Sequence, residues 1–166
     1  MSVDLFQVIR TLGKAAVDTL VAAPDLFIRN MAGETLLHEA IASNNMPAFE
    51  CLLRAGLDAN AADSIGQTPL HFAAAYQNCH AAEHILVQGG DVGLRDRYGN
   101  TALWSAVFNA KGKYGVVALL LENGAGRQAE AENMRGKSPL GFARLVGDQE
   151  MIRMLEAAIA NDDILD

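Results

Sequence analysis

The chain has 166 residues, of which 51% are hydrophobic and 20% charged. This length is sufficient for one well-buried core, so we expect a single domain. The 20 Asp and Glu outnumber the 13 Lys and Arg, which gives a formal net charge of −7. Such a surface repels phosphate backbones, so nucleic acid is not expected as a partner.

The two cysteines, Cys51 and Cys79, are too few for a disulfide framework, and we predict that both are buried, reduced thiols. The amino-terminal residues lack the basic segment of a signal peptide, and no uncharged stretch approaches the roughly 18 residues of a membrane span. These features predict a soluble, cytoplasmic protein.

One short phrase occurs four times along the chain. Its copies are Gly33-Glu34-Thr35-Leu36-Leu37-His38, Gly66-Gln67-Thr68-Pro69-Leu70-His71, Gly99-Asn100-Thr101-Ala102-Leu103-Trp104 and Gly136-Lys137-Ser138-Pro139-Leu140-Gly141. The first three copies begin 33 residues apart and the fourth follows after 37. A second series of glycines, Gly56, Gly89 and Gly124, trails the phrases. A fixed period of this size is typical of a solenoid.

The clearest copy of the repeat spans residues 63–95. Its Thr68-Pro69-Leu70-His71, the following Ala73-Ala74 and the closing Gly89 lie where an ankyrin repeat has them. The chain therefore resembles the ankyrin-repeat family over nearly its whole length. This resemblance implies an all-α solenoid of stacked helix-turn-helix units, joined by β-turn or hairpin-like loops.

The period also predicts how the chain is divided. Ala23-Pro24-Asp25-Leu26 precedes Gly33 as Gly56-Leu57-Asp58-Ala59 precedes Gly66, which indicates a degenerate first repeat. We expect one ankyrin domain over residues 1–166. It divides into an amino-terminal cap at 1–29 and repeats at 30–62, 63–95, 96–132 and 133–166.

Local signals within each repeat predict a helical hairpin. The Thr or Ser of each phrase can cap the first helix, and Pro69 and Pro139 suit its first position. Apolar residues at helical spacing predict a second helix, which the trailing glycine ends. The third repeat is longer, and its extra residues fall near 110–115 and 126–130, where we expect loops.

The segment His80-Ala81-Ala82-Glu83-His84 matches the H-x-x-E-H pattern of certain zinc proteases, in which two histidines on one helical face bind the metal. It lies inside the second helix of a repeat, and no further domain is available for a third ligand and a cleft. A zinc-dependent hydrolase using His80, Glu83 and His84 is therefore the alternative hypothesis. The main hypothesis expects no catalytic residue, no metal and no cofactor.

The resemblance gives His38 and His71 a structural role, with ring hydrogen bonds inside the repeat and to the next turn. Trp104 replaces this histidine in the third phrase and cannot copy both bonds, because an indole donates one bond and accepts none. We predict that Trp104 serves packing more than binding.

The resemblance also places a binding surface on the concave face, formed by the loop tips and the exposed side of each first helix. Central aromatic and Arg residues carry most interface energy. The predicted protein-binding residues are Ile65, Tyr76, Arg97, Tyr98, Phe108 and Met134. Tyr76 and Phe108 are expected near Tyr98, in one aromatic strip.

These features together predict a protein-protein interaction module that acts by recognition alone, as an adaptor or an inhibitor. Inhibitors of enzymes, immunity-type proteins and partners of neighbouring enzymes are known roles of similar ankyrin proteins. We expect a monomer. A homo-oligomeric scaffold that pairs through its apolar strip is a further alternative.

Overall fold

A computed structural model describes residues 4–23 and 25–162 of the chain. Ten α-helices and two 3₁₀ turns are found in this part. They are α1 (Leu5–Leu12), η1 (Gly13–Ala15), α2 (Ala16–Val21), α3 (Leu36–Ala42), α4 (Met46–Arg54), α5 (Pro69–Ala75), α6 (Cys79–Val87), α7 (Ala102–Asn109), α8 (Gly115–Glu122), η2 (Gly126–Gln128), α9 (Pro139–Val146) and α10 (Gln149–Asp162).

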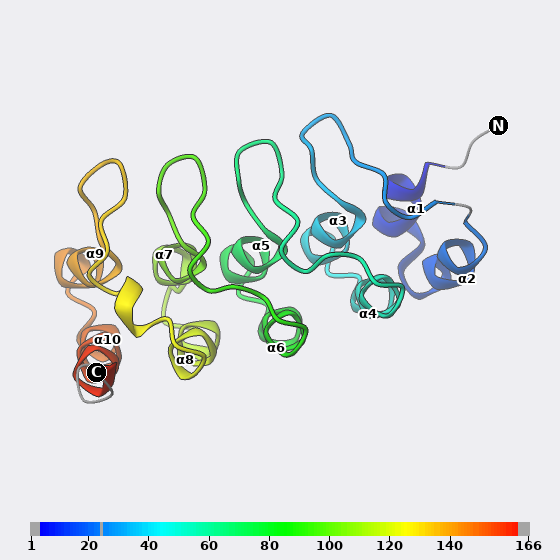
Figure 1. Cartoon of the computed structure of the whole chain (residues 1–166). Helices are drawn as coiled ribbons and strands as arrows, with labels where there is room; N and C mark the ends of the chain where they lie inside the picture. Colours follow the sequence, from blue (N-terminus) through cyan, green and yellow to red (C-terminus); the bar gives the residue numbers. More distant parts are fainter. Residues whose placement is uncertain (1–3, 24, 163–166) are drawn as a thin grey trace.

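The helices are stacked in two rows (Figure 1). The odd-numbered helices form the row beside the long loops, and the even-numbered helices form the other row. The described residues contain no strand, only an isolated antiparallel bridge between Arg29 and Thr35. The predicted all-α stack of helical hairpins is confirmed.

The odd-numbered helices α3, α5, α7 and α9 begin where the sequence predicted. Thr35 and Thr68 form capping boxes with the histidine three positions on, and Ser138 accepts a bond from the Gly141 amide. Pro69 occupies the first helical position, where its missing N–H costs nothing. A capping side chain thus sets the start of these helices.

Small side chains allow the odd-numbered helices to pack closely. Ala40, Ala73, Ala74 and Ala106 are buried on successive helices α3, α5 and α7. Larger residues such as Leu70 fill the space between the rows, and one continuous core runs along the stack. Because a single hairpin cannot bury its apolar face, stability comes from contacts between neighbouring hairpins.

The tips of the long loops are bonded to one another. The amide of Ser64 donates to Ala32 O at 2.9 Å, and the amide of Arg97 donates to Ile65 O at 2.7 Å. The Met134 amide makes the corresponding bond to Tyr98 O at 2.9 Å. The four loops therefore stand in a fixed row above the odd-numbered helices (Figure 1).

Helices α1 and α2 form the first pair and pack against α3 and α4. The side-chain amide of Asn45, which also caps α4, donates to the backbone oxygens of Ile9 and Gly13. This is the arrangement that a degenerate first repeat requires. The predicted boundaries include residues 1–3, 24 and 163–166, which lie outside the described part, and the division itself stays a prediction.

The predicted extra length of the third repeat lies in its connections. Residues 110–114 link α7 to α8, whereas three residues, 76–78, link α5 to α6. The second insertion forms the 3₁₀ turn η2. Tyr114 ties the longer link to the next hairpin, because its hydroxyl donates to the carboxylate of Asp148 at 3.0 Å. This bond raises the pKa of Tyr114.

The prediction of two buried thiols is wrong. Cys51 is half-buried and Cys79 is exposed, and neither forms a disulfide. Cys79 is the first residue of α6, so its side chain lies at the helix end beside Gly115 and not between the rows. Among the described residues, no helix is long and apolar enough to cross a bilayer.

Candidate protein-binding site

The histidines of the first two phrases, His38 and His71, each link the start of their own helix to the next loop by hydrogen bonds. Nδ1 of His71 accepts from the Thr68 amide at 3.2 Å, and Nε2 lies 3.1 Å from Asn100 O in the next loop. His38 makes the same contacts with Thr35 and Gln67. The structural role predicted for both histidines is confirmed.

Burial lowers the pKa of both His38 and His71 below the ordinary value of 6.5. The bonds to Gln67 O and Asn100 O oppose this shift, since they favour the protonated ring. The neutral ring suits the geometry, because Nδ1 must accept from the backbone while Nε2–H donates to a carbonyl. Each ring is thus held neutral as a link between repeats.

Trp104 departs from this pattern. It is half-buried, and Thr101 alone caps its helix, by accepting a bond from the Trp104 amide at 3.3 Å. The Trp104 ring packs on Phe142 and Phe108, with centroid distances of 5.8 and 6.1 Å. The predicted packing role is correct, but the same ring also lines an open groove.

This groove has a volume of about 720 Å³ and lies between the last two loops and helices α7 and α9. Rings and one aliphatic side chain form its apolar part. They belong to Tyr98, Trp104, Phe108, Phe142 and Leu145. Phe108 and Phe142 are in mutual contact at 5.2 Å between centroids. We call this set, with Arg135 and Lys137 at its rim, the aromatic groove.

The charged side chains of the aromatic groove are mostly positive, although the whole chain is acidic. Arg135 and Lys137 come from the last loop, and Glu132 precedes it. Within the described part of the chain, neither cation forms a side-chain ion pair. The groove therefore offers apolar surface beside two cations that are available to a ligand.

The structure divides the predicted aromatic strip between two hollows. Tyr98 and Phe108, 46% and 54% exposed, lie in the aromatic groove. Tyr76 is also exposed, but its ring contact is with Phe72, and it lines a smaller hollow between the ends of α3 and α5. Among the described residues, no ring contact joins Tyr76 to Phe108 or to Tyr98.

The other three predicted residues lie on the loop tips. Met134 is 79% exposed and Ile65 is half-buried. The guanidinium of Arg97 donates to Ser64 O at 2.7 Å, so it also braces the neighbouring tip. These residues flank the loops but do not line the aromatic groove.

Sequence reasoning missed Phe142 as a site residue and underestimated Trp104. A usable signal was present in the phrase itself. The histidine position is Trp104 in the third copy and Gly141 in the fourth, and Gly141 lines the groove. Because both the third and the fourth copies lack the histidine, the space between these two loops and helices α7 and α9 remains an open groove.

A second cluster lies on the even-numbered row. His80 and His84 on α6 meet Glu50 on α4, and one ligand atom from each lies within 4.8 Å of the others. A third possible ligand, which no further domain was expected to supply, is thus Glu50 on the neighbouring hairpin. Glu83, the third member of the sequence pattern, lines a groove between α4 and α6 with Glu50 and His84 but is not part of this group.

The comparison with family models completes the assignment. A model of ankyrin repeats in three copies matches residues 5–92 and again 70–164. The chain belongs to the ankyrin-repeat family, whose repeats are generally protein-protein interaction modules. A comparison with curated proteins gave no match.

Proposed function

We propose that the chain binds a protein partner in the aromatic groove and acts as an adaptor or an inhibitor, without bond-making chemistry. The observation that carries the proposal is the partly exposed cluster of Tyr98, Trp104 and Phe108 with Phe142, set between two loops that are bonded to each other. Aromatic side chains in such hollows are typical centres of binding energy.

The groove also indicates what the partner presents. An apolar or aromatic side chain can fill the space over Phe108 and Phe142, where it gains area burial and ring contacts. Arg135 and Lys137 at the rim favour a carboxylate beside that anchor. Trp104 makes no indole hydrogen bond within the described residues, so its N–H can donate to a partner backbone carbonyl.

Binding in this groove requires little ordering of the protein. The Tyr98 loop and the Met134 loop are joined by a backbone bond, and Asp96 and Asn133 each accept two amides within their own loop. A preformed surface loses less entropy when it binds. Rigid loops therefore favour a partner that docks on a fixed shape.

The test is affinity capture from a native lysate with the intact chain, followed by titration of the purified captured protein. We expect Phe108→Ala to weaken binding by about 2 kcal/mol or more, as for a central anchor. Met31→Ala is the matched control, because Met31 is a fully exposed loop-tip residue at the other end of the stack. Equal loss in both variants, or in neither, would contradict the proposal.

An enzyme that is inhibited when captured would indicate an inhibitor, and a partner that stays active would indicate an adaptor. Light scattering over a concentration range tests self-association through the same groove. Hydrolysis of a peptide or ester by zinc-loaded protein, lost in Glu83→Gln, would instead support the alternative of a hydrolase that uses His80, Glu83 and His84.

A further inference from the structure

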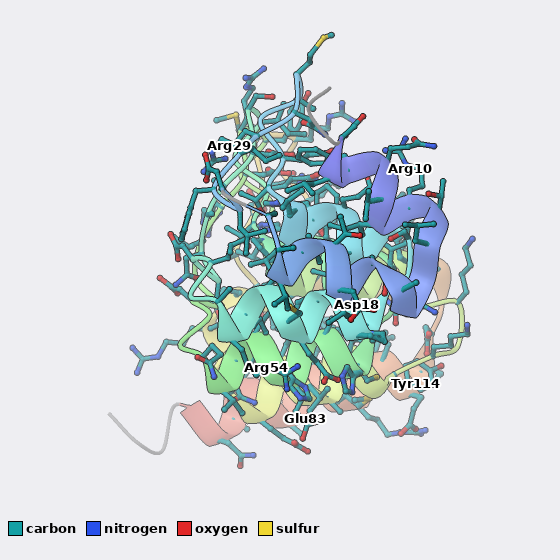
Figure 2. The ribbon with its side chains drawn as sticks, turned by 90° about the vertical axis from the view of Figure 1, so that its right-hand side faces the viewer. Arg10, Asp18, Arg29, Arg54, Glu83 and Tyr114 are labelled. Atoms are coloured by element: carbon teal, nitrogen blue, oxygen red, sulfur yellow. The ribbon has the colours of Figure 1, made fainter. Side chains whose placement is uncertain are left out.

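The Glu50, His80 and His84 cluster lies on the row of helices away from the loops. Figure 2 shows Arg54 and Glu83 on this side of the molecule, far from Arg29 at the base of a loop. A groove of about 660 Å³ runs here between α4 and α6, and Glu50, Arg54, Glu83 and His84 line it. The protein-binding function proposed above makes no use of this region.

The two histidines are placed as a chelating pair. They are one helical turn apart on α6, so they share a face, and their ring centroids are 4.2 Å apart. Nδ1 of His84 lies 2.9 Å from the His80 carbonyl oxygen, which can only accept. Nδ1 of His84 therefore carries the proton, and its Nε2 presents a free lone pair in the neutral ring.

Glu50 supplies the third arm from the neighbouring hairpin. Its Oε1 lies 2.9 Å from Nε2 of His80. Ligand atoms around a tetrahedral zinc, with bonds of roughly 2.0–2.2 Å, lie about 3.3 Å apart. A metal that replaces the shared proton would therefore widen this pair by only a few tenths of an ångström. The other distances between ligand atoms of Glu50, His80 and His84 are all within 4.8 Å, and rotation of these surface side chains can shorten them.

The surrounding charges favour a cation. Glu50 and Glu83 are anionic and Arg54 is the one cation among the groove-lining residues that the structure describes. Two imidazoles and one carboxylate suit Zn²⁺ and its first-row neighbours, while Mg²⁺ and Ca²⁺ prefer all-oxygen ligands. A water molecule would complete four-fold coordination.

We propose that Glu50, His80 and His84 form a binding site for one Zn²⁺ or a similar divalent transition metal, which links α4 to α6. The bound metal would bridge two neighbouring hairpins across a groove, where no other side-chain ion pair joins these helices in the described part. Metal binding would then stabilise the fold, because the unfolded chain does not hold the three ligands together.

The direct test is titration of the intact, chelator-treated protein with Zn²⁺ by calorimetry, together with thermal melting. We expect one saturable site per chain with micromolar free metal and a higher melting temperature with Zn²⁺. His80→Gln, His84→Gln and Glu50→Gln should each weaken binding about tenfold or more and reduce the thermal shift. Mg²⁺ should not compete.

Two control variants distinguish this site from zinc binding by neighbouring side chains. Glu83→Gln should weaken Zn²⁺ binding far less than the three ligand variants, since Glu83 contributes a nearby negative charge but is not among the three ligands. Cys51→Ser with Cys79→Ser should also bind normally, although both thiols lie on the same two helices. Absence of a one-to-one phase, or binding lost with the thiols and kept without His80 and His84, would overturn the proposal.

Discussion

The predicted repeats 63–95 and 96–132 carry different residues, His71 and Trp104, at the same position of the motif. In the first, His71 joins its own phrase to the next loop through Asn100 O and fills the angle between loop and helix. In the second, Trp104 makes no such bond to any residue that the structure describes, and it lines an open groove with Phe108. The comparison separates the part of the repeat that holds the stack together from the part available for binding.

Departures from the repeat thus mark the candidate binding surface. His71 is buried and its polar atoms are bonded within the protein. Trp104 is bulkier and exchanges these bonds for ring contacts, which leaves apolar surface in contact with solvent. Specificity is therefore expected where the phrase changes, and stability where it is kept.

The largest expected effect on the free energy of unfolding comes from replacing His71 and Trp104, in separate variants, by phenylalanine. His71→Phe removes the acceptor of the buried Thr68 amide and the donor to Asn100 O, and should lower the free energy of unfolding by about 3 kcal/mol. Trp104→Phe keeps a ring against Phe142 and should cost less than about 1.5 kcal/mol. Urea unfolding followed by circular dichroism measures both. Equal costs would show that the hydrogen bonds of His71 contribute no more to stability than the ring contacts of Trp104.

The second prediction concerns the loss of folding stability at acidic pH. Burial lowers the pKa of His38 and His71 in the folded state, so below pH 6.5 the unfolded chain binds protons that the folded chain does not. Stability should be full above pH 6.5 and fall as the pH drops towards the lowered pKa values. Each histidine contributes at most about 1.4 kcal/mol per pH unit.

Denaturation midpoints measured from about pH 5 to about pH 8 test this, because that range spans the ordinary pKa of histidine. Replacing His71 by Phe should flatten the curve. Replacing His38 by Phe as well should flatten it further, because burial also lowers the pKa of His38. A slope that is unchanged in both variants would contradict the assignment.

The smallest expected difference is between substitutions of two loop-tip glycines. Gly66 and Gly136 both have positive φ, of 86° and 63°. A Cβ on Gly66 would approach Asp96 Cα to 3.2 Å, whereas on Gly136 it would meet only a carboxylate oxygen at 3.8 Å. Gly66→Ala should cost about 2 kcal/mol and Gly136→Ala about 1 kcal/mol. Thermal melting ranks the two, and the reverse order would argue against tight tip contacts.

Most of the fold could be predicted because the repeat gives its own signals. Thr68 and Pro69 set a helix start, and the glycine at 89 follows a helix end, as the structure confirms. The period of 33 residues then indicated which units are neighbours. The prediction for Cys79 was wrong because burial at a helix end depends on the neighbouring hairpin and not on residue type.

The candidate sites were less predictable, since they depend on distances between repeats. Tyr98 and Phe108 meet in one groove, but the contact of Phe108 with Phe142 crosses to a helix 34 residues further on. Glu50 lies 30 residues before His80 and belongs to no local pattern. Such pairings follow from how the hairpins are stacked, which the order of residues does not state directly.

The bonds between loop tips have a consequence for changes in chain length. Each of the last three tips donates an amide to the preceding tip, through Ser64, Arg97 and Met134, so the spacing between successive tips is fixed. The natural insertions, at 110–114 and 126–128, lie outside the tips and leave this spacing intact. An extra copy of residues 63–95, inserted in frame after residue 95, would meet the same donors and acceptors on both sides. The stack can therefore be lengthened by a whole repeat while the aromatic groove near its carboxyl-terminal end is kept.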